Sequence, residues 1–155
     1  MIEYIKGDVT LAREFVILQG CNAQGKMNSG VAKAIRDKWP EVFTDYSNEH
    51  HLYGLALGGI YPCFVYQCKP FDVQKIIVNG ITQQYYGRDP NVVYVDYGAI
   101  ECVFRQTKIL LEKMKLDTFA TVKIGSGLGN GSWERIEGLI NKVFPDYWVK
   151  IYVPE

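Results

Sequence analysis

The chain has 155 residues, a length that suits one domain with a substantial hydrophobic core. Its 17 basic and 17 acidic residues balance, so the sequence lacks the basic surplus of a general nucleic-acid binder. Residues 1–6 have no signal-peptide character, and no apolar run approaches the roughly 18 residues that cross a bilayer. We therefore expect a single-domain, monomeric, cytoplasmic protein without a membrane span.

Runs rich in β-branched and aromatic residues predict the strands of a sheet. Helical patterns separate most of these runs, and this alternation implies a mostly parallel sheet covered on both faces. The predicted strands are residues 1–6, 15–20, 59–66, 75–82, 121–124 and 147–153, with Phe71 and Asp72 in the turn between the third and the fourth.

Three segments carry apolar residues at helical spacing. The first spans residues 30–39, where a proline ends it and a further short helix follows. The clearest spans residues 96–114, with apolar side chains at steps of three and four and Asp96 as the expected N-cap. The last spans residues 133–144, and a serine directly before it is another suitable cap.

The cysteines and histidines do not form a pattern typical of a metal site. No two cysteines make a C-x-x-C pair and the two histidines are adjacent, so a four-ligand zinc site would need unusual partners. We expect no metal and no cofactor, and cysteines that are reduced and mostly buried. The residues concerned are Cys21, Cys63, Cys68, Cys102, His50 and His51.

A ligand of an open α/β sheet binds at the carboxyl ends of its strands, so the segments that follow the strands are the candidate site. After the first strand comes Gly7-Asp8-Val9-Thr10, where the Asp8 carboxylate could accept a hydrogen bond from an amino group such as that of adenine. An Asx-turn that leaves the strand explains the same residues, and for this segment alone the turn is the favoured interpretation.

Residues 21–32 run from the second strand directly into a helix N-terminus. Unpaired N–H groups and the positive end of the helix dipole meet there, an arrangement that suits a pyrophosphate. The segment is not a Walker A loop, because Met27 follows Gly25-Lys26 where that motif needs serine or threonine. A flexible connection with Gly30 as N-cap is an equally good interpretation of this loop in isolation.

Residues 125–131 contain four glycines in seven positions, between the fifth strand and the last helix. Glycine at this density costs chain entropy and is typical of backbone that approaches a ligand closely. The pattern is not the dinucleotide fingerprint G-x-G-x-x-G, because Asn130 occupies the sixth position and no ribose-binding acid follows. A binding role is favoured here over a simple connector.

Together, in order and spacing, these segments resemble the macro domain family, in particular small phage and bacterial members related to ADP-ribose 1''-phosphate phosphatases and ADP-ribosyl-ester hydrolases. The match covers nearly the whole chain. It implies a three-layer α/β/α sandwich with a mixed, mostly parallel sheet of about six strands. The matching residues are Gly7-Asp8-Val9-Thr10, Gly20-Cys21-Asn22-Ala23-Gln24-Gly25, Ser29-Gly30-Val31-Ala32-Lys33-Ala34-Ile35, Gln83-Gln84-Tyr85-Tyr86-Gly87-Arg88, Val95-Asp96-Tyr97 and Ile124-Gly125-Ser126-Gly127-Leu128-Gly129 with Trp133.

The resemblance also implies a role for individual residues toward ADP-ribose or ADP-ribose 1''-phosphate. Asp8 would accept from the adenine amino group, Val9 would contact the same ring, and Tyr152 could pack against it or be an ordinary strand aromatic. Asn22 would face the distal ribose. The pyrophosphate would lie between backbone amides of two loops, namely Gly30, Val31 and Ala32 on one side and Ser126, Gly127, Leu128, Gly129 and Asn130 on the other.

The sequence departs from the family pattern where catalysis is concerned. Related sequences often carry histidine where this chain has Gln19, glycine at Asn28 and aspartate at Ser132. Ester hydrolases of the family have a lysine after the fourth strand, whereas this chain has Ile81-Thr82-Gln83-Gln84, and they have an aspartate in the glycine loop that is missing here.

The leading hypothesis is therefore a phosphatase acting on ADP-ribose 1''-phosphate, with Asn22 and Gln19 as candidate catalytic residues and Lys26 as a further donor. The alternatives are a non-catalytic ADP-ribose reader, an ADP-ribosyl hydrolase, and an interaction domain that has kept the fold and lost the pocket. His50 and His51 are assigned to a solvated helix end and not to the site.

Overall fold

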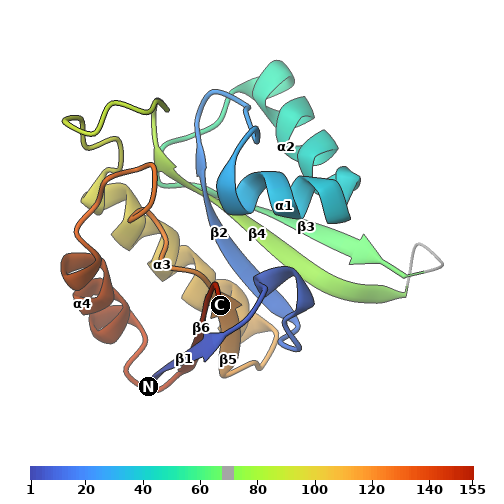
Figure 1. Cartoon of the computed structure of the whole chain (residues 1–155). Helices are drawn as coiled ribbons and strands as arrows, with labels where there is room; N and C mark the ends of the chain where they lie inside the picture. The colour runs from blue at the N-terminus through green and yellow to red at the C-terminus, as the bar shows by residue number, and fades with distance from the viewer. Residues whose placement is uncertain (68–71) are drawn as a thin grey trace.

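The computed structural model describes residues 1–67 and 72–155, and within them one sheet has the strand order β1-β6-β5-β2-β4-β3 (Figure 1). Phe71 and Cys68, for which the sequence predicts a turn position and a reduced thiol, lie outside these residues. The elements are β1 (Ile2–Lys6), the 3-10 helix η1 (Val9–Leu11), β2 (Val16–Asn22), α1 (Gly30–Lys38), α2 (Pro40–Tyr53), β3 (Ile60–Tyr66), β4 (Val73–Gln83), α3 (Tyr97–Lys113), β5 (Thr118–Thr121), α4 (Trp133–Val143) and β6 (Trp148–Val153).

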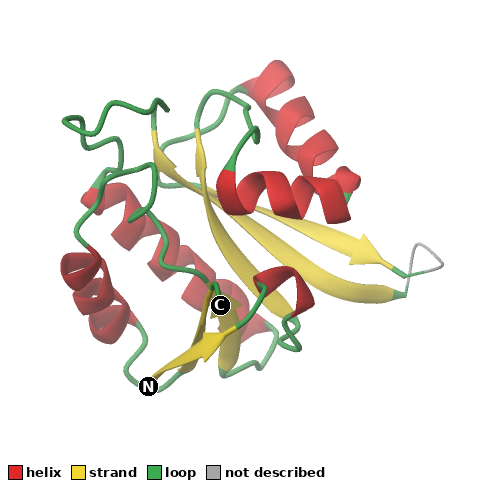
Figure 2. Ribbon diagram, in the orientation of Figure 1, coloured by secondary structure: helices red, strands yellow, loops and turns green. Residues whose placement is uncertain are grey.

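The sheet is the middle of three layers, with α1 and α2 on one face and α3 and α4 on the other (Figure 2). Successive residues of a strand point to opposite faces, which divides the core in two. In β2, Leu18 packs with the α3 and α4 side chains, whereas Ile17 packs with those of α1 and α2. Both side chains are fully buried. The predicted three-layer sandwich with a mixed, mostly parallel sheet is confirmed.

Five of the strands are parallel, and only β3 runs antiparallel to its neighbour β4. The chain leaves β2 through α1 and α2 toward β3 and β4, and it leaves β5 through α4, on the opposite face, toward β6. The connections from β2 and from β5 thus lead in opposite directions across the sheet. The winding therefore reverses between these two hydrogen-bonded neighbours. Such a switch point leaves a crevice at the carboxyl ends of the two strands.

Side-chain caps begin the two helices that the sequence predicts most clearly. Asp96 accepts a hydrogen bond from the Ala99 N–H at the start of α3, and Ser132 accepts one from the Arg135 N–H at the start of α4. The short helix expected after residue 39 is instead a helix of 14 residues, α2. Pro40 ends α1 and also begins α2, because proline at the first helical position loses no hydrogen bond.

One further expectation needs correction. Strand β5 spans Thr118–Thr121 and not residues 121–124, because Phe119 and Ala120 are the residues that enter the core, and the chain leaves the sheet after Thr121. Cys102 is exposed on α3, whereas Cys21 and Cys63 are buried thiols. In the part of the chain that the structure describes, no helix has the length and apolarity needed to cross a bilayer.

Candidate functional site

A cleft of about 1440 Å³ opens at the edge of the sheet where the five parallel strands end. The turns after β2 and β5 form two of its walls, so the two loops that the sequence singled out border one cleft, and their contact with a diphosphate stays a prediction. Every residue predicted to bind ligand lines this cleft except Asn130. The residues brought together are Asp8, Val9, Gln19, Asn22, Gly30, Val31, Ala32, Ser126, Gly127, Leu128, Gly129 and Tyr152.

Asp8 and Tyr152 lie at the ends of β1 and β6, which are paired strands, and both line the cleft. The Asp8 Oδ1 atom accepts hydrogen bonds from the backbone N–H and the hydroxyl of Thr10, at 2.9 and 2.8 Å. These bonds hold the pKa of Asp8 below its usual range. Asp8 can therefore form the Asx-turn and also face a ligand. Among the described residues only its Oδ1 accepts hydrogen bonds, so Oδ2 is available to a ligand.

The first turn of α1 presents free amide groups to the cleft. Ser29 is the N-cap of α1, but its side chain makes no capping hydrogen bond, unlike Asp96 and Ser132 in α3 and α4. An added Cβ atom at Gly30 would meet nothing within 4 Å, so the backbone there borders open space. Uncapped N–H groups at the positive end of a helix dipole form an anion-binding site.

The glycines of the 125–131 loop fall into two groups. An added Cβ atom at Gly127 would meet nothing within 4 Å, so this residue faces the open cleft. At Gly129 and Gly131 the added atom would lie 2.8 Å from the carbonyl oxygen of Gly125, and closer than 3 Å to Val95. Gly129 and Gly131 therefore allow the loop to fold tightly on itself, whereas Gly127 has open space where a side chain would be.

Asn22 organises the loop in which it lies. Its Oδ1 accepts hydrogen bonds from the backbone N–H groups of Gln24 and Lys26, at 3.0 and 3.4 Å, and its Nδ2 donates to the Lys26 carbonyl at 2.9 Å. The Tyr46 hydroxyl lies 3.1 Å from the same Oδ1. The Asn22 side chain is therefore mainly a structural clamp, with one N–H of its amide left for a ligand.

Gln19, the second candidate catalytic residue, is 1% exposed on β2. Its Nε2 donates to Asn79 Oδ1 on the neighbouring strand β4, at 2.8 Å. Its Oε1 has no hydrogen-bond partner among the described residues. Gln19 thus belongs to the floor of the cleft, where its side chain is almost fully buried.

Asn130 is turned away from the cleft. Its Nδ2 donates to the carbonyl oxygens of Asp89 and Val92, at 3.0 and 2.7 Å. The neighbouring Gly129 carbonyl accepts from the Tyr94 N–H at 2.9 Å. On the other wall, Gln24 Nε2 donates to the Gln84 carbonyl at 3.0 Å. The segment from 84 to 95 is thereby tied to both loops of the site.

Three basic side chains, Lys26, Arg88 and Lys123, line the cleft of this otherwise neutral protein, together with the acidic Asp8 and Glu155. The sequence interpretation gave no role to Arg88 or Lys123. The sequence predicts a strand over residues 121–124 that would include Lys123, but β5 ends at Thr121. Nothing in the local sequence of an exposed loop indicates that Arg88 faces a cleft. Their charge favours an anionic ligand.

The histidines do not line the cleft, but His50 supports one of its loops. An added Cβ atom at Gly25 would lie 2.8 Å from His50 Nδ1, so the imidazole packs directly behind the loop that begins at Asn22. Within residues 1–67 and 72–155, no group of three or more His, Cys, Asp or Glu side chains is placed to hold a metal ion.

Comparison with known proteins gives consistent relatives. No family model matches the chain. The DNA ADP-ribosyl glycohydrolase of Mycobacterium tuberculosis is 26% identical over 157 residues, which cover 99% of this chain but 42% of that protein. The ADP-ribose 1''-phosphate phosphatase of Candida albicans is 24% identical over 162 residues, 99% of each chain. The solved macrodomain of Mycobacterium tuberculosis DarG superposes with a TM-score of 0.82 at 25% identity, covering 100% of this chain and 99% of that one.

Fold and cleft together define a three-layer α/β protein with a ligand site at the switch point of its sheet. The three relatives narrow this description to one class of α/β protein. The chain has the macro domain fold, and its sequence is similar to those of proteins that act on ADP-ribosyl groups. It spans less than half of the mycobacterial glycohydrolase that it matches, so it corresponds to one part of that longer protein.

Proposed function

We propose that the cleft binds ADP-ribose. The observation that carries this proposal is the pair of open backbone segments at Gly30 and Gly127, which border one cleft from the turns after two adjacent strands. Amides from two such turns can hold a diphosphate between them without a net basic protein surface. Asp8 at another strand end supplies the acceptor for the adenine amino group. The relatives' names support the same ligand, since both contain ADP-ribose or ADP-ribosyl.

For turnover, we propose hydrolysis of the phosphate from ADP-ribose 1''-phosphate. The Candida albicans phosphatase, which this chain matches over 99% of both lengths, supports this activity. Lys26 and Arg88 are cations able to stabilise charge on a phosphoryl group. Two carboxylates line the cleft, namely Asp8, which we assign to the adenine, and Glu155. Because Gln19 is buried and Asn22 is mostly engaged, we expect slow turnover that depends on positioning and electrostatics.

A second candidate activity is release of ADP-ribose from DNA, which the name of the mycobacterial relative suggests. One observation favours it: Tyr86 lines the cleft together with Arg88, and both Tyr86 and its chain neighbour Tyr85 are more than half exposed. Exposed aromatic rings next to a cation are typical of surfaces that stack the bases of single strands. Gln83 and Gln84 occupy the segment in which ester hydrolases of the family carry a lysine, which ranks this activity second.

The experiment combines calorimetry with two turnover assays on the same protein. We expect binding of ADP-ribose, phosphate release from ADP-ribose 1''-phosphate, and no release of ADP-ribose from a modified DNA oligonucleotide. Binding without either turnover would make the protein a reader. An ADP-ribose dissociation constant weaker than about 1 mM, or roughly 4 kcal/mol of binding free energy, would rule out the proposed function altogether.

A further inference from the structure

Glu14 and Tyr152, which are 138 positions apart in the sequence, are joined by a hydrogen bond at one end of the cleft. The Tyr152 hydroxyl donates to Glu14 Oε1 at 2.7 Å. The Tyr152 ring lines the cleft next to Gly7, where an added Cβ atom would lie 3.9 Å from its Cδ2. Burial, together with this bond to a carboxylate, raises the pKa of Tyr152 to about 12, so the phenol stays protonated at neutral pH.

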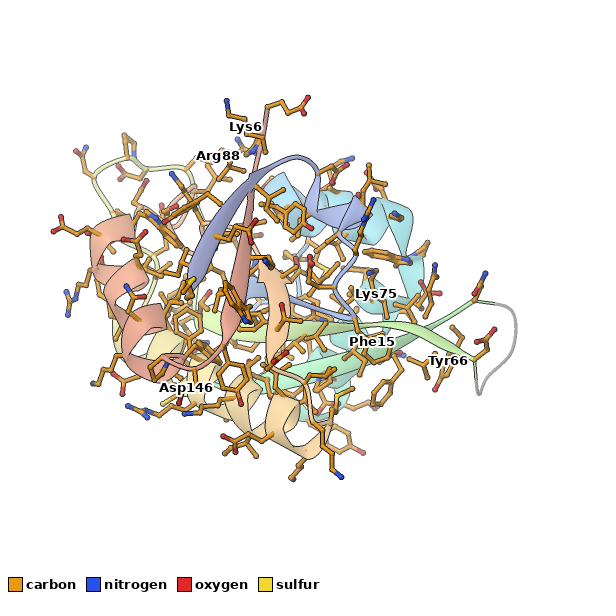
Figure 3. The ribbon with its side chains drawn as sticks, turned by 90° about the horizontal axis from the view of Figure 1, so that it is seen from below. Lys6, Phe15, Tyr66, Lys75, Arg88 and Asp146 are labelled. Atoms are coloured by element: carbon orange, nitrogen blue, oxygen red, sulfur yellow. The ribbon has the colours of Figure 1, made fainter. Side chains whose placement is uncertain are left out.

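The backbone of Glu14 is itself fixed from below. Lys75 of β4 is only 9% exposed, and its Nζ donates to the carbonyl oxygens of Ala12 and Glu14, both at 2.7 Å. The next residue of β4 also bonds this segment, because the Ile76 N–H donates to the Phe15 carbonyl at 2.9 Å. Lys75 and Phe15 lie close together in Figure 3. Glu14 therefore presents its carboxylate from a backbone that is held to the centre of the sheet.

We infer that Glu14 is a positioning residue that fixes the ring of Tyr152 as a stacking surface for the adenine base; this inference rests on the proposed function. A tyrosine side chain at the end of a strand can turn about two torsions, and a hydrogen bond at its tip removes that freedom. Because the phenol proton is used by Glu14, the ring offers the ligand a face and no donor. Asp8 then supplies the hydrogen bond to the base.

The test measures the affinity of wild type, Glu14→Ala, Glu14→Gln and Tyr152→Phe for ADP-ribose and, by displacement titration, for ribose 5-phosphate, which has no base. We expect Glu14→Ala and Tyr152→Phe each to weaken ADP-ribose about threefold to fivefold, below the loss of a whole base-stacking contact because the ring itself remains, with less than about twofold change for ribose 5-phosphate. The double variant should be no weaker than either single variant. Glu14→Gln keeps an oxygen that accepts from the phenol and should retain most of the affinity.

Glu112→Ala is the matched control, because it removes the same charge from an exposed position of α3 outside the cleft. Thermal unfolding of all variants reports any general loss of structure. If wild type binds ADP-ribose and Glu14→Ala binds it equally well, the inference is overturned and the proposed function stands. Equal losses of affinity for ADP-ribose and ribose 5-phosphate would have the same meaning. Absence of ADP-ribose binding by wild type would overturn the proposed function and the inference with it.

Discussion

The Tyr46 hydroxyl donates a hydrogen bond to the backbone carbonyl of Asn22 and lies 3.1 Å from the Asn22 Oδ1 atom. Tyr46 belongs to α2 and is almost fully buried, and Asn22 is the last residue of β2. Burial raises the pKa of Tyr46 far above its usual range, so the phenol remains a donor at neutral pH. The loop that carries one wall of the cleft thus depends on a helix that does not reach the ligand.

Asn22→Ala should lower the free energy of unfolding by about 1–3 kcal/mol, because it leaves buried or half-buried loop donors without an acceptor. Tyr46→Phe removes a partner of the same cluster, so the double variant should lose less than the sum of the two single losses. Urea unfolding of the four proteins measures both quantities. A fully stable Asn22→Ala protein that binds ADP-ribose but shows no phosphate release would instead support the catalytic role predicted from the sequence.

Gly127→Glu should reduce affinity for ADP-ribose by at least about 100-fold, since it adds bulk and negative charge where phosphate oxygens are expected. The matched control is Gly138→Glu, because Gly138 also has open space around it but lies on α4 outside the cleft. We expect the two melting temperatures to stay close together, with calorimetry separating the variants. Gly30→Glu is a poorer test, because Gly30 has a φ of +61° and any side chain there adds backbone strain.

Asp8→Asn should weaken binding of ADP-ribose about tenfold and leave ribose 5-phosphate nearly unaffected. The Thr10 hydrogen bonds hold the pKa of Asp8 below its usual range, so the stability that its charge adds is present above the ordinary carboxyl pKa and is lost as the pH falls through the lowered value. The wild-type to Asp8→Asn affinity ratio should therefore be equal at pH 7 and pH 5. A ratio that shrinks between these values would contradict the depressed pKa.

Gly138→Ala should stabilise the protein by about 0.5–1 kcal/mol, because glycine inside a helix carries an entropy cost that alanine avoids. Gly138 lies in the middle of α4 with nothing within 4 Å of an added Cβ atom. Chemical denaturation with an unchanged m-value would measure this gain. Lower stability would mean that the exposed face of α4 has a contact that the structure does not include.

The elements that the sequence predicts best are those with a local signal. Asp96 and the apolar spacing after it indicate α3 at nearly its true bounds, and the glycine loop after β5 indicates one wall of the cleft. The alternation of strands and helices was enough to predict that a cleft lies at the carboxyl ends of the strands. The confinement of the chain to one domain and its monomeric state stay predictions.

Long-range relationships could not be read from the sequence. Asn130 looked like a member of the binding loop, but its amide holds Asp89 and Val92, some 40 positions earlier. The partnership of Glu14 with Tyr152 has no local pattern at either residue. The length of α2 was underestimated because proline was interpreted as the end of a helix and not also as the beginning of the next.

The placement of the cleft between β2 and β5 also affects how the protein takes up its ligand. Neighbouring strands of a sheet keep a separation of about 4.8 Å, set by the ladder of backbone hydrogen bonds. The two walls rise from strands joined in this way, so their spacing is preset before any ligand arrives. If the proposed nucleotide binds between these walls, the amide donors are already in place and little chain ordering would oppose its association.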